Sequence, residues 1–122
     1  MSKNKVEIAK SYYAAMVQKD LNKVAEHLHP DVKFSGPLDQ RQGKESLMEA
    51  VKGFANFVEE VKYYTEVTSG DLVMFTYDVC CKEPMGVQHA AAKFVVRDGL
   101  IHEIELFYDP RPTLKVMGEI FN

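Results

Sequence analysis

Cysteine is scarce in this sequence, and its only two cysteines, Cys80 and Cys81, are adjacent. Neighbouring residues on a strand point to opposite faces of the sheet, so this pair suits neither a disulfide framework nor a metal knuckle. The spacing indicates two small buried thiols in a reducing compartment, and we expect a cytoplasmic protein.

Long apolar runs and clusters of basic residues are also missing. No stretch approaches the roughly 20 apolar residues that a membrane span needs, and residues 1–10 lack the apolar core of a signal peptide. The formal net charge is -3, whereas phosphate binding needs a clustered basic face. We therefore expect neither a membrane nor a nucleic acid as a partner.

The composition is that of a folded globular protein: 46% of the 122 residues are hydrophobic and 27% are charged. This length supports a hydrophobic core without disulfide or metal staples. No repeat, linker or low-complexity tract divides the chain, so we expect one domain over residues 1–122.

Helical spacing dominates the first half of the chain. Asn4 and Glu7 make a capping-box-like start for a first helix, and Asp20 can cap a second one that Pro30 is expected to end. A third helix follows Gly43, with apolar residues in helical register. These residues are Leu47, Met48, Val51, Phe54, Ala55 and Val58.

Beyond the third helix the hydrophobic period changes to two, which predicts a meander of antiparallel strands. The expected strands are Val61–Thr68, Leu72–Cys81, Val87–Arg97 and Leu100–Asp109, after a short strand at Val32–Ser35. Leu114, Met117 and Phe121 predict a short closing helix. The order predicts an α+β fold in which three N-terminal helices pack on the concave face of a curved antiparallel sheet and leave a cavity between them.

The turn Arg97-Asp98-Gly99 sets the register of the last hairpin. A two-residue turn would pair Arg97 with Leu100, whereas a three-residue loop with Gly99 in the left-handed conformation pairs Val96 with Leu100. The second register places Lys93 opposite Glu103, a favourable cross-strand pair. We therefore expect the three-residue loop, with Ala92, Phe94, Ile104, Leu106 and Tyr108 on one face.

Several short motifs, in this order and spacing, resemble the nuclear transport factor two-like superfamily, in particular its SnoaL-like and ketosteroid-isomerase-like branch. They are Tyr12-Tyr13-Ala14-Ala15, Lys19-Asp20-Leu21, His29-Pro30-Asp31-Val32, the loop from Gly36-Pro37 to Gly43, Val95-Val96-Arg97-Asp98-Gly99 and Phe107-Tyr108-Asp109-Pro110. The resemblance implies a cone-shaped sheet, a cystatin-like α+β barrel with a pocket at its wide end, and a homodimer through the convex sheet surface. The fold hosts isomerases, cyclases, dehydratases, epoxide hydrolases and plain binding proteins, so the fold alone does not give the function.

The same resemblance tests the known chemistries of the branch. Steroid isomerases use a tyrosine, a carboxylate base and a protonated acid, and these positions fall on Tyr12, Gly36 and Ala92. Gly36 and Ala92 cannot move a proton, so we expect no steroid isomerisation. The acid on the last strand of the limonene epoxide hydrolases falls on Leu106, which excludes that pattern too.

The remaining candidates depend on which face of strand 72–81 lines the pocket. The family pattern sends Met74, Thr76, Asp78 and Cys80 inward, whereas hydrophobicity prefers Phe75, Tyr77 and Val79. We adopt the family register. In that register Asp78 and Tyr12 are the candidate catalytic residues, and burial should raise the pKa of Asp78. The expected ligand-binding residues are Phe34, Met48, Thr76, Phe94, Ile104, Leu106 and Tyr108.

Each candidate residue can also have a purely structural role. Asp78 can be a solvated or salt-bridged strand residue, and buried tyrosines more often find a backbone partner than a substrate. His27, His29 and Asp31 do not share a helix face, so we expect no metal site, and no motif calls for a cofactor.

Two hypotheses follow. The first is a pocket that binds or transforms a small hydrophobic molecule, either carbonyl-bearing or polycyclic; an enzyme of this kind would be an isomerase-, cyclase- or dehydratase-type acid–base catalyst without a cofactor. The second is a non-catalytic interaction module that uses a dimeric sheet surface. Phe75, Tyr77, Val79 and Phe107 on the outer face predict a homodimer through the sheet.

Overall fold

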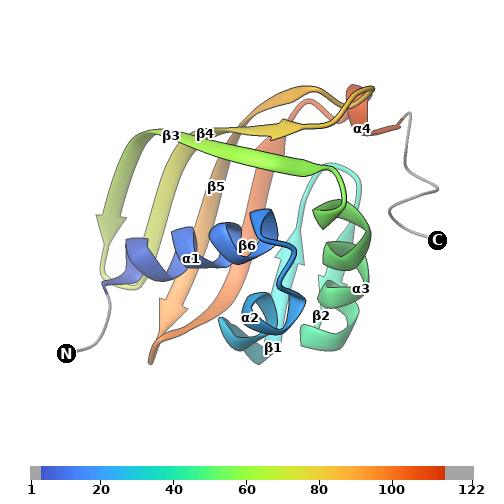
Figure 1. The fold of residues 1–122 in the computed structure, drawn as a ribbon. Coiled ribbons are helices and arrows are strands. Elements are labelled where there is room, and N and C mark those ends of the chain that lie inside the picture. The colour runs from blue at the N-terminus through green and yellow to red at the C-terminus, as the bar shows by residue number, and fades with distance from the viewer. Residues whose placement is uncertain (1–3, 115–122) are drawn as a thin grey trace.

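The computed structural model describes residues 4–114, which form a six-stranded curved, unclosed sheet with helices against its concave face (Figure 1). The helices are α1 (Lys5–Val17), α2 (Leu21–Glu26), α3 (Lys44–Ala55) and α4 (Arg111–Leu114). The strands are β1 (Leu28–Ser35), β2 (Gln40–Gln42), β3 (Val58–Ser69), β4 (Leu72–Cys81), β5 (Val87–Arg97) and β6 (Leu100–Tyr108). The predicted α+β cone is confirmed. Met117 and Phe121 of the expected closing helix lie outside the described residues.

The strand order is β2-β1-β6-β5-β4-β3, and the neighbours pair antiparallel except for β1 and β6. The parallel pair departs from the expected antiparallel sheet. Parallel neighbours need a long crossover rather than a hairpin, and here α3 and four strands separate β1 from β6 along the chain. This pairing brings the end of β1 beside the end of β6.

Helix α1 forms as its cap and apolar pattern predict. The Asn4 side chain accepts a hydrogen bond from the backbone N–H of Glu7 at 2.8 Å. Its buried residues occupy two adjacent stripes, so the helix lies deep against the sheet. They are Ile8, Ala9, Tyr12, Tyr13, Ala15 and Met16.

Helix α2 begins at the predicted cap, because the Asp20 side chain accepts from the backbone N–H of Lys23. Its predicted end at Pro30 is wrong. The helix stops at Glu26, and Pro30 lies inside β1, where the pairing with β6 changes register. The backbone N–H of Ile101 donates to the carbonyl of His27 at 2.8 Å, so pairing with β6 draws the chain into the sheet before the proline.

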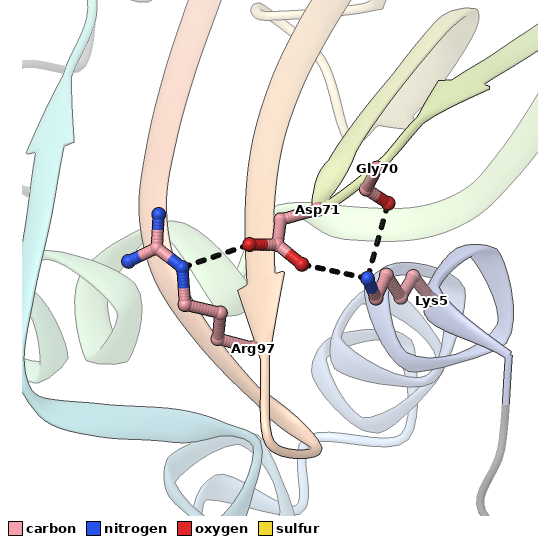
Figure 2. A network of polar contacts seen from close by, with 4 residues as sticks. All are labelled: Lys5, Gly70, Asp71 and Arg97. Atoms are coloured by element: carbon pink, nitrogen blue, oxygen red, sulfur yellow. Dashed lines mark hydrogen bonds and ion pairs between the residues drawn. The ribbon is translucent and has the colours of Figure 1, made fainter.

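An ion-pair network links the start of α1 to the turn between β3 and β4 and to the end of β5 (Figure 2). Asp71, in the turn between β3 and β4, accepts from Lys5 at 2.7 Å and from Arg97 at 2.9 Å. Lys5 also donates to the carbonyl of Gly70. The hydrogen bond from Lys5, and after it the one from Arg97, holds the pKa of Asp71 below its ordinary value.

The predicted register of the β5–β6 hairpin is wrong. Asp98 and Gly99 both have positive φ, at 51° and 79°, and form a two-residue turn that pairs Arg97 with Leu100. The register then shifts between Val95 and Val96, so Lys93 lies opposite Glu105, not Glu103. Because of this shift the expected apolar face survives, and Phe94 pairs with Ile104.

Two further sequence expectations concern the cysteines and the membrane. Cys81 is buried, and burial raises the pKa of its thiol to about 12, whereas Cys80 on the outer face is partly exposed. Both cysteines are free. Within residues 4–114, no helix has the length and apolar character that crossing a membrane requires.

Candidate functional site

A cavity of about 70 Å³ lies between α1, α3 and the concave face of the sheet. Its wall is mainly apolar: Met16 comes from α1, Leu47, Val51 and Phe54 come from α3, and Val79 comes from β4. A surface groove shares three lining residues with this cavity, namely Gly36, Leu106 and Tyr108. These three are only partly buried, so the cavity opens where the chain leaves β1 and β6.

The Tyr12 hydroxyl is a polar group in a cavity lining that is mainly apolar. Its side chain is 3% exposed, and its ring packs edge-on against Tyr13 and Phe94. Among residues 4–114 its hydroxyl has no hydrogen-bond partner. Tyr12 is one of the residues that line the cavity. Burial raises its pKa well above the ordinary value, so the group stays a neutral donor.

A second pair of hydroxyls lies beside Tyr12. The oxygens of Tyr13 and Tyr77 are 2.6 Å apart, and both residues line the cavity. One hydroxyl donates a hydrogen bond to the other. The O–H of the accepting tyrosine can therefore donate to a ligand oxygen. Burial raises the pKa of both groups.

The mouth of the cavity holds an acid that the sequence analysis missed. Asp39 lines the cavity between β1 and β2, and its carboxylate accepts from the backbone N–H of Gln40 at 2.9 Å and from Nε of Arg41 at 2.5 Å. Burial and the nearby charge of Asp39 raise the pKa of Tyr108, which lines the same mouth. The polar loop after Gly36-Pro37 was a signal for a surface turn, but it did not show that one side chain turns inward.

Four of the predicted site residues line this cavity: Tyr12, Phe34, Leu106 and Tyr108. The others are placed elsewhere. Phe94 and Ile104 are fully buried in the core and lie outside the cavity lining. Met48 packs against the core from α3, also outside the lining.

The predicted inward face of β4 is wrong. Phe75, Tyr77 and Val79 point into the core, whereas Thr76 and Asp78 lie on the outer face of the sheet. The aromatic contacts of Tyr13 with Phe75 and Tyr77 explain this choice, because α1 offers those rings a buried partner. Neither Thr76 nor Asp78 reaches the cavity.

Asp78 is instead a hydrogen-bonded carboxylate of the outer face. The Tyr64 hydroxyl donates to its Oδ2 at 2.5 Å, and Nδ1 of His89 bonds its Oδ1. The hydrogen bond from Tyr64, followed by that from His89, lowers the pKa of Asp78. The expectation of a raised pKa is therefore wrong, and the alternative of a paired strand residue is correct.

The histidines of the predicted cluster take other positions. His29 stacks on His102, with ring centroids 4.1 Å apart, and its Nδ1 accepts from the backbone N–H of Asp31. Within the part of the chain that the structure describes, no three His, Cys, Asp or Glu side chains are grouped to hold a metal ion.

The sequence matches the family model of the SnoaL-like domain over residues 9–104. No curated protein gives a significant sequence match. Solved structures share the fold at low identity. A nuclear transport factor two-like protein from Cytophaga hutchinsonii is 19% identical with a TM-score of 0.78, over 93% of this chain and 97% of that chain.

Two enzymes have the same fold. An LEH-like epoxide hydrolase from Mycobacterium tuberculosis is 17% identical with a TM-score of 0.77, over 95% of this chain and 90% of that one. A steroid delta-isomerase from Pseudomonas aeruginosa is 19% identical with a TM-score of 0.72, over 99% of this chain and 90% of that one. Identities this low show a shared fold and leave the chemistry to the residues of the cavity.

Proposed function

The chain belongs to the SnoaL-like domain family, within the nuclear transport factor two-like superfamily, and on this premise we propose that its cavity binds a small hydrophobic molecule carrying a carbonyl oxygen. Relatives of this fold include cyclases and isomerases that act on small molecules. That background supports a ligand in the cavity, and the lining residues support its chemical class.

The Tyr12 hydroxyl carries the proposal. The Tyr12 side chain is buried and lines the cavity, and its hydroxyl has no hydrogen-bond partner among residues 4–114. A ligand oxygen that accepts a hydrogen bond from this hydroxyl would gain about 0.5–1.5 kcal/mol. The apolar wall around it favours a hydrocarbon body over a polar one.

The volume of the cavity supports one of the two ligand types expected from the sequence. An apolar cavity of about 150 Å³ holds one benzene ring. The present cavity, at about 70 Å³, holds only part of a ring unless the lining moves or the ligand projects through the mouth. A carbonyl-bearing molecule with one ring therefore fits better than a polycyclic one.

A pair of matched compounds tests this proposal. Acetophenone and α-methylstyrene have nearly the same shape, but only acetophenone offers a carbonyl oxygen. We expect acetophenone to bind more tightly in titrations followed by protein NMR, with the shifted resonances at cavity residues. Replacing Tyr12→Phe should weaken acetophenone binding by about tenfold, the equivalent of 1.4 kcal/mol, and leave α-methylstyrene binding unchanged.

Tyr64→Phe is the matched control, because it removes the same atom from an exposed tyrosine of the outer face. It should leave both affinities unchanged. Equal binding of the two compounds, or an unchanged acetophenone affinity in Tyr12→Phe, would contradict a carbonyl-binding cavity.

The outer face of the sheet supports a second role, contact with another copy of the chain. Tyr64, Val67, Met74 and Phe107 are large, apolar and between 37% and 64% exposed. Strand pairing places Val67 beside Met74 on this face. We propose a homodimer through this surface, and a pure interaction module is the alternative function if the cavity binds nothing. We also propose a cytoplasmic location, which the free thiols of Cys80 and Cys81 support.

A further inference from the structure

The polar groups deep in the cavity differ from the polar group at its mouth. The hydroxyl donors of Tyr12, Tyr13 and Tyr77 belong to side chains that are at most 4% exposed. The acid Asp39, by contrast, lies at the mouth, where its side chain is 23% exposed. The deep end therefore offers protons to a ligand, and the mouth offers a carboxylate that accepts one.

We propose that Asp39 selects ligands carrying a hydroxyl or amino donor opposite the carbonyl, so that the preferred class is a single ring with an acceptor at one end and a donor at the other. This inference rests on the proposed function, because it uses the same cavity. It adds a second contact that the apolar wall and Tyr12 do not supply.

Asp39 is held in place for such a contact. Its backbone carbonyl accepts from the N–H of Gly36 at 2.9 Å, which closes the turn after β1. Arg41, which binds its Oδ2, also donates to the carbonyl of Ser46 in α3 at 3.2 Å. The turn is thus tied to α3, and the carboxylate has little freedom to leave the mouth.

The carboxylate also has capacity left. Its two oxygens offer about four acceptor sites, and the hydrogen bonds to Gln40 and Arg41 use two of them. Hydrogen bonds to a charged acceptor are stronger than neutral ones, so one ligand donor here has a measurable effect on affinity.

Charge at the cavity favours the same class of ligand. Among residues 4–114, Asp39 is the only acid in the cavity lining, and no lysine, arginine or histidine belongs to that lining. Tyr108, beside it, stays protonated because burial and the charge of Asp39 raise its pKa. The Asp39 carboxylate is paired with Arg41, and its remaining acceptor sites lie beside a neutral hydroxyl, an arrangement that favours a ligand that donates a hydrogen bond.

Two matched probes test the inference on the whole protein. Para-hydroxyacetophenone and para-fluoroacetophenone share the ring and the carbonyl, and the small fluorine cannot donate. We expect the wild-type protein to bind the hydroxyl compound about tenfold more tightly in titration calorimetry, at a mildly acidic pH where the phenol is neutral. Asp39→Asn should reduce that preference to threefold or less, with little change for the fluoro compound.

Asp98→Asn is the control, because it removes the same charge from the exposed turn between β5 and β6, outside the cavity lining. It should keep the tenfold preference. A wild-type protein that binds both probes equally would overturn the role of Asp39 and leave the carbonyl-binding cavity intact, and this comparison does not depend on how the variant folds. A preference that survives in Asp39→Asn would overturn it too. A protein that binds neither probe would overturn the proposed function, and the inference with it.

Discussion

The hydroxyl of Tyr13 on α1 and the hydroxyl of Tyr77 on β4 share a hydrogen bond of 2.6 Å inside the core. Both side chains are at most 4% exposed. Their rings are also in contact, with centroids 5.3 Å apart. This polar contact in an apolar surrounding links α1 to β4, and both residues line the cavity.

Substitutions at this pair should be strongly non-additive. Tyr13→Phe leaves the Tyr77 hydroxyl buried without its partner, so we expect a loss of about 1–3 kcal/mol in the free energy of unfolding, and the same for Tyr77→Phe. The double variant replaces both hydroxyls, so its loss should be clearly smaller than the sum. Urea unfolding at neutral pH measures all three. Strictly additive losses would mean that the two hydroxyls do not stabilise the core as a pair.

The cavity should not support steroid isomerisation. Gly36 lines it at the position that the resemblance gives to the base, and Ala92 is fully buried at the position of the oxyanion acid. A cavity of about 70 Å³ is also far too small for four fused rings. We therefore expect purified protein to leave a 3-oxo-Δ5-steroid unchanged above background in a spectrophotometric assay. Turnover that disappears in Tyr12→Phe would refute this.

Asp78 should contribute to stability in a pH-dependent way. Its hydrogen bonds to Tyr64 and His89 lower its pKa in the folded state, so the folded protein binds this proton less tightly than the unfolded chain. The stabilisation is therefore complete well above the unfolded value of about 3.9 and is lost as pH falls through the folded pKa.

Asp78→Asn should accordingly lower the free energy of unfolding at neutral pH, and the difference from wild type should shrink in acid. A carboxyl carbon titration by NMR gives the pKa directly. Asp98→Asn serves as the control, since Asp98 lies in an exposed turn. A carboxyl that titrates above the ordinary aspartate range would show that these hydrogen bonds do not form in solution.

The meander was predictable because its signals are local and repeated. Leu72–Cys81 and Val87–Arg97 alternate over many residues, and the bounds of both strands are correct. Strand β2 could not be found in this way. Gln40–Gln42 is entirely polar, and it is a strand only because its backbone pairs with β1, a contact between segments that no local pattern encodes.

Site residues were predictable on segments that have only one apolar face. Tyr12 and Leu106 sit on segments whose inward face is clear, and both line the cavity. Residues 72–81 are apolar on both faces, so the choice between Asp78 and Tyr77 depended on what α1 places above them. Asp39 depended on the conformation of a turn, which the sequence pattern does not specify.

The outer face of the sheet leads to a prediction about assembly. The residues expected there from the sequence were partly wrong, because Phe75, Tyr77 and Val79 are buried inside. Phe107 is exposed as expected, at 48%, and Val67, which is 59% exposed, adds another apolar side chain to this face. We expect the protein at micromolar concentration to show about twice the mass of one chain in light scattering.

Phe107→Glu and Val67→Glu should each shift the protein toward the monomer. In a twofold dimer the same face of both copies meets, so each substitution buries like charges on both sides, which disfavours association. Leu114→Glu is the matched control, because Leu114 is 51% exposed but belongs to α4. It should leave the mass unchanged. A monomeric wild-type protein, or dissociation by Leu114→Glu alone, would show that the sheet face is not the interface.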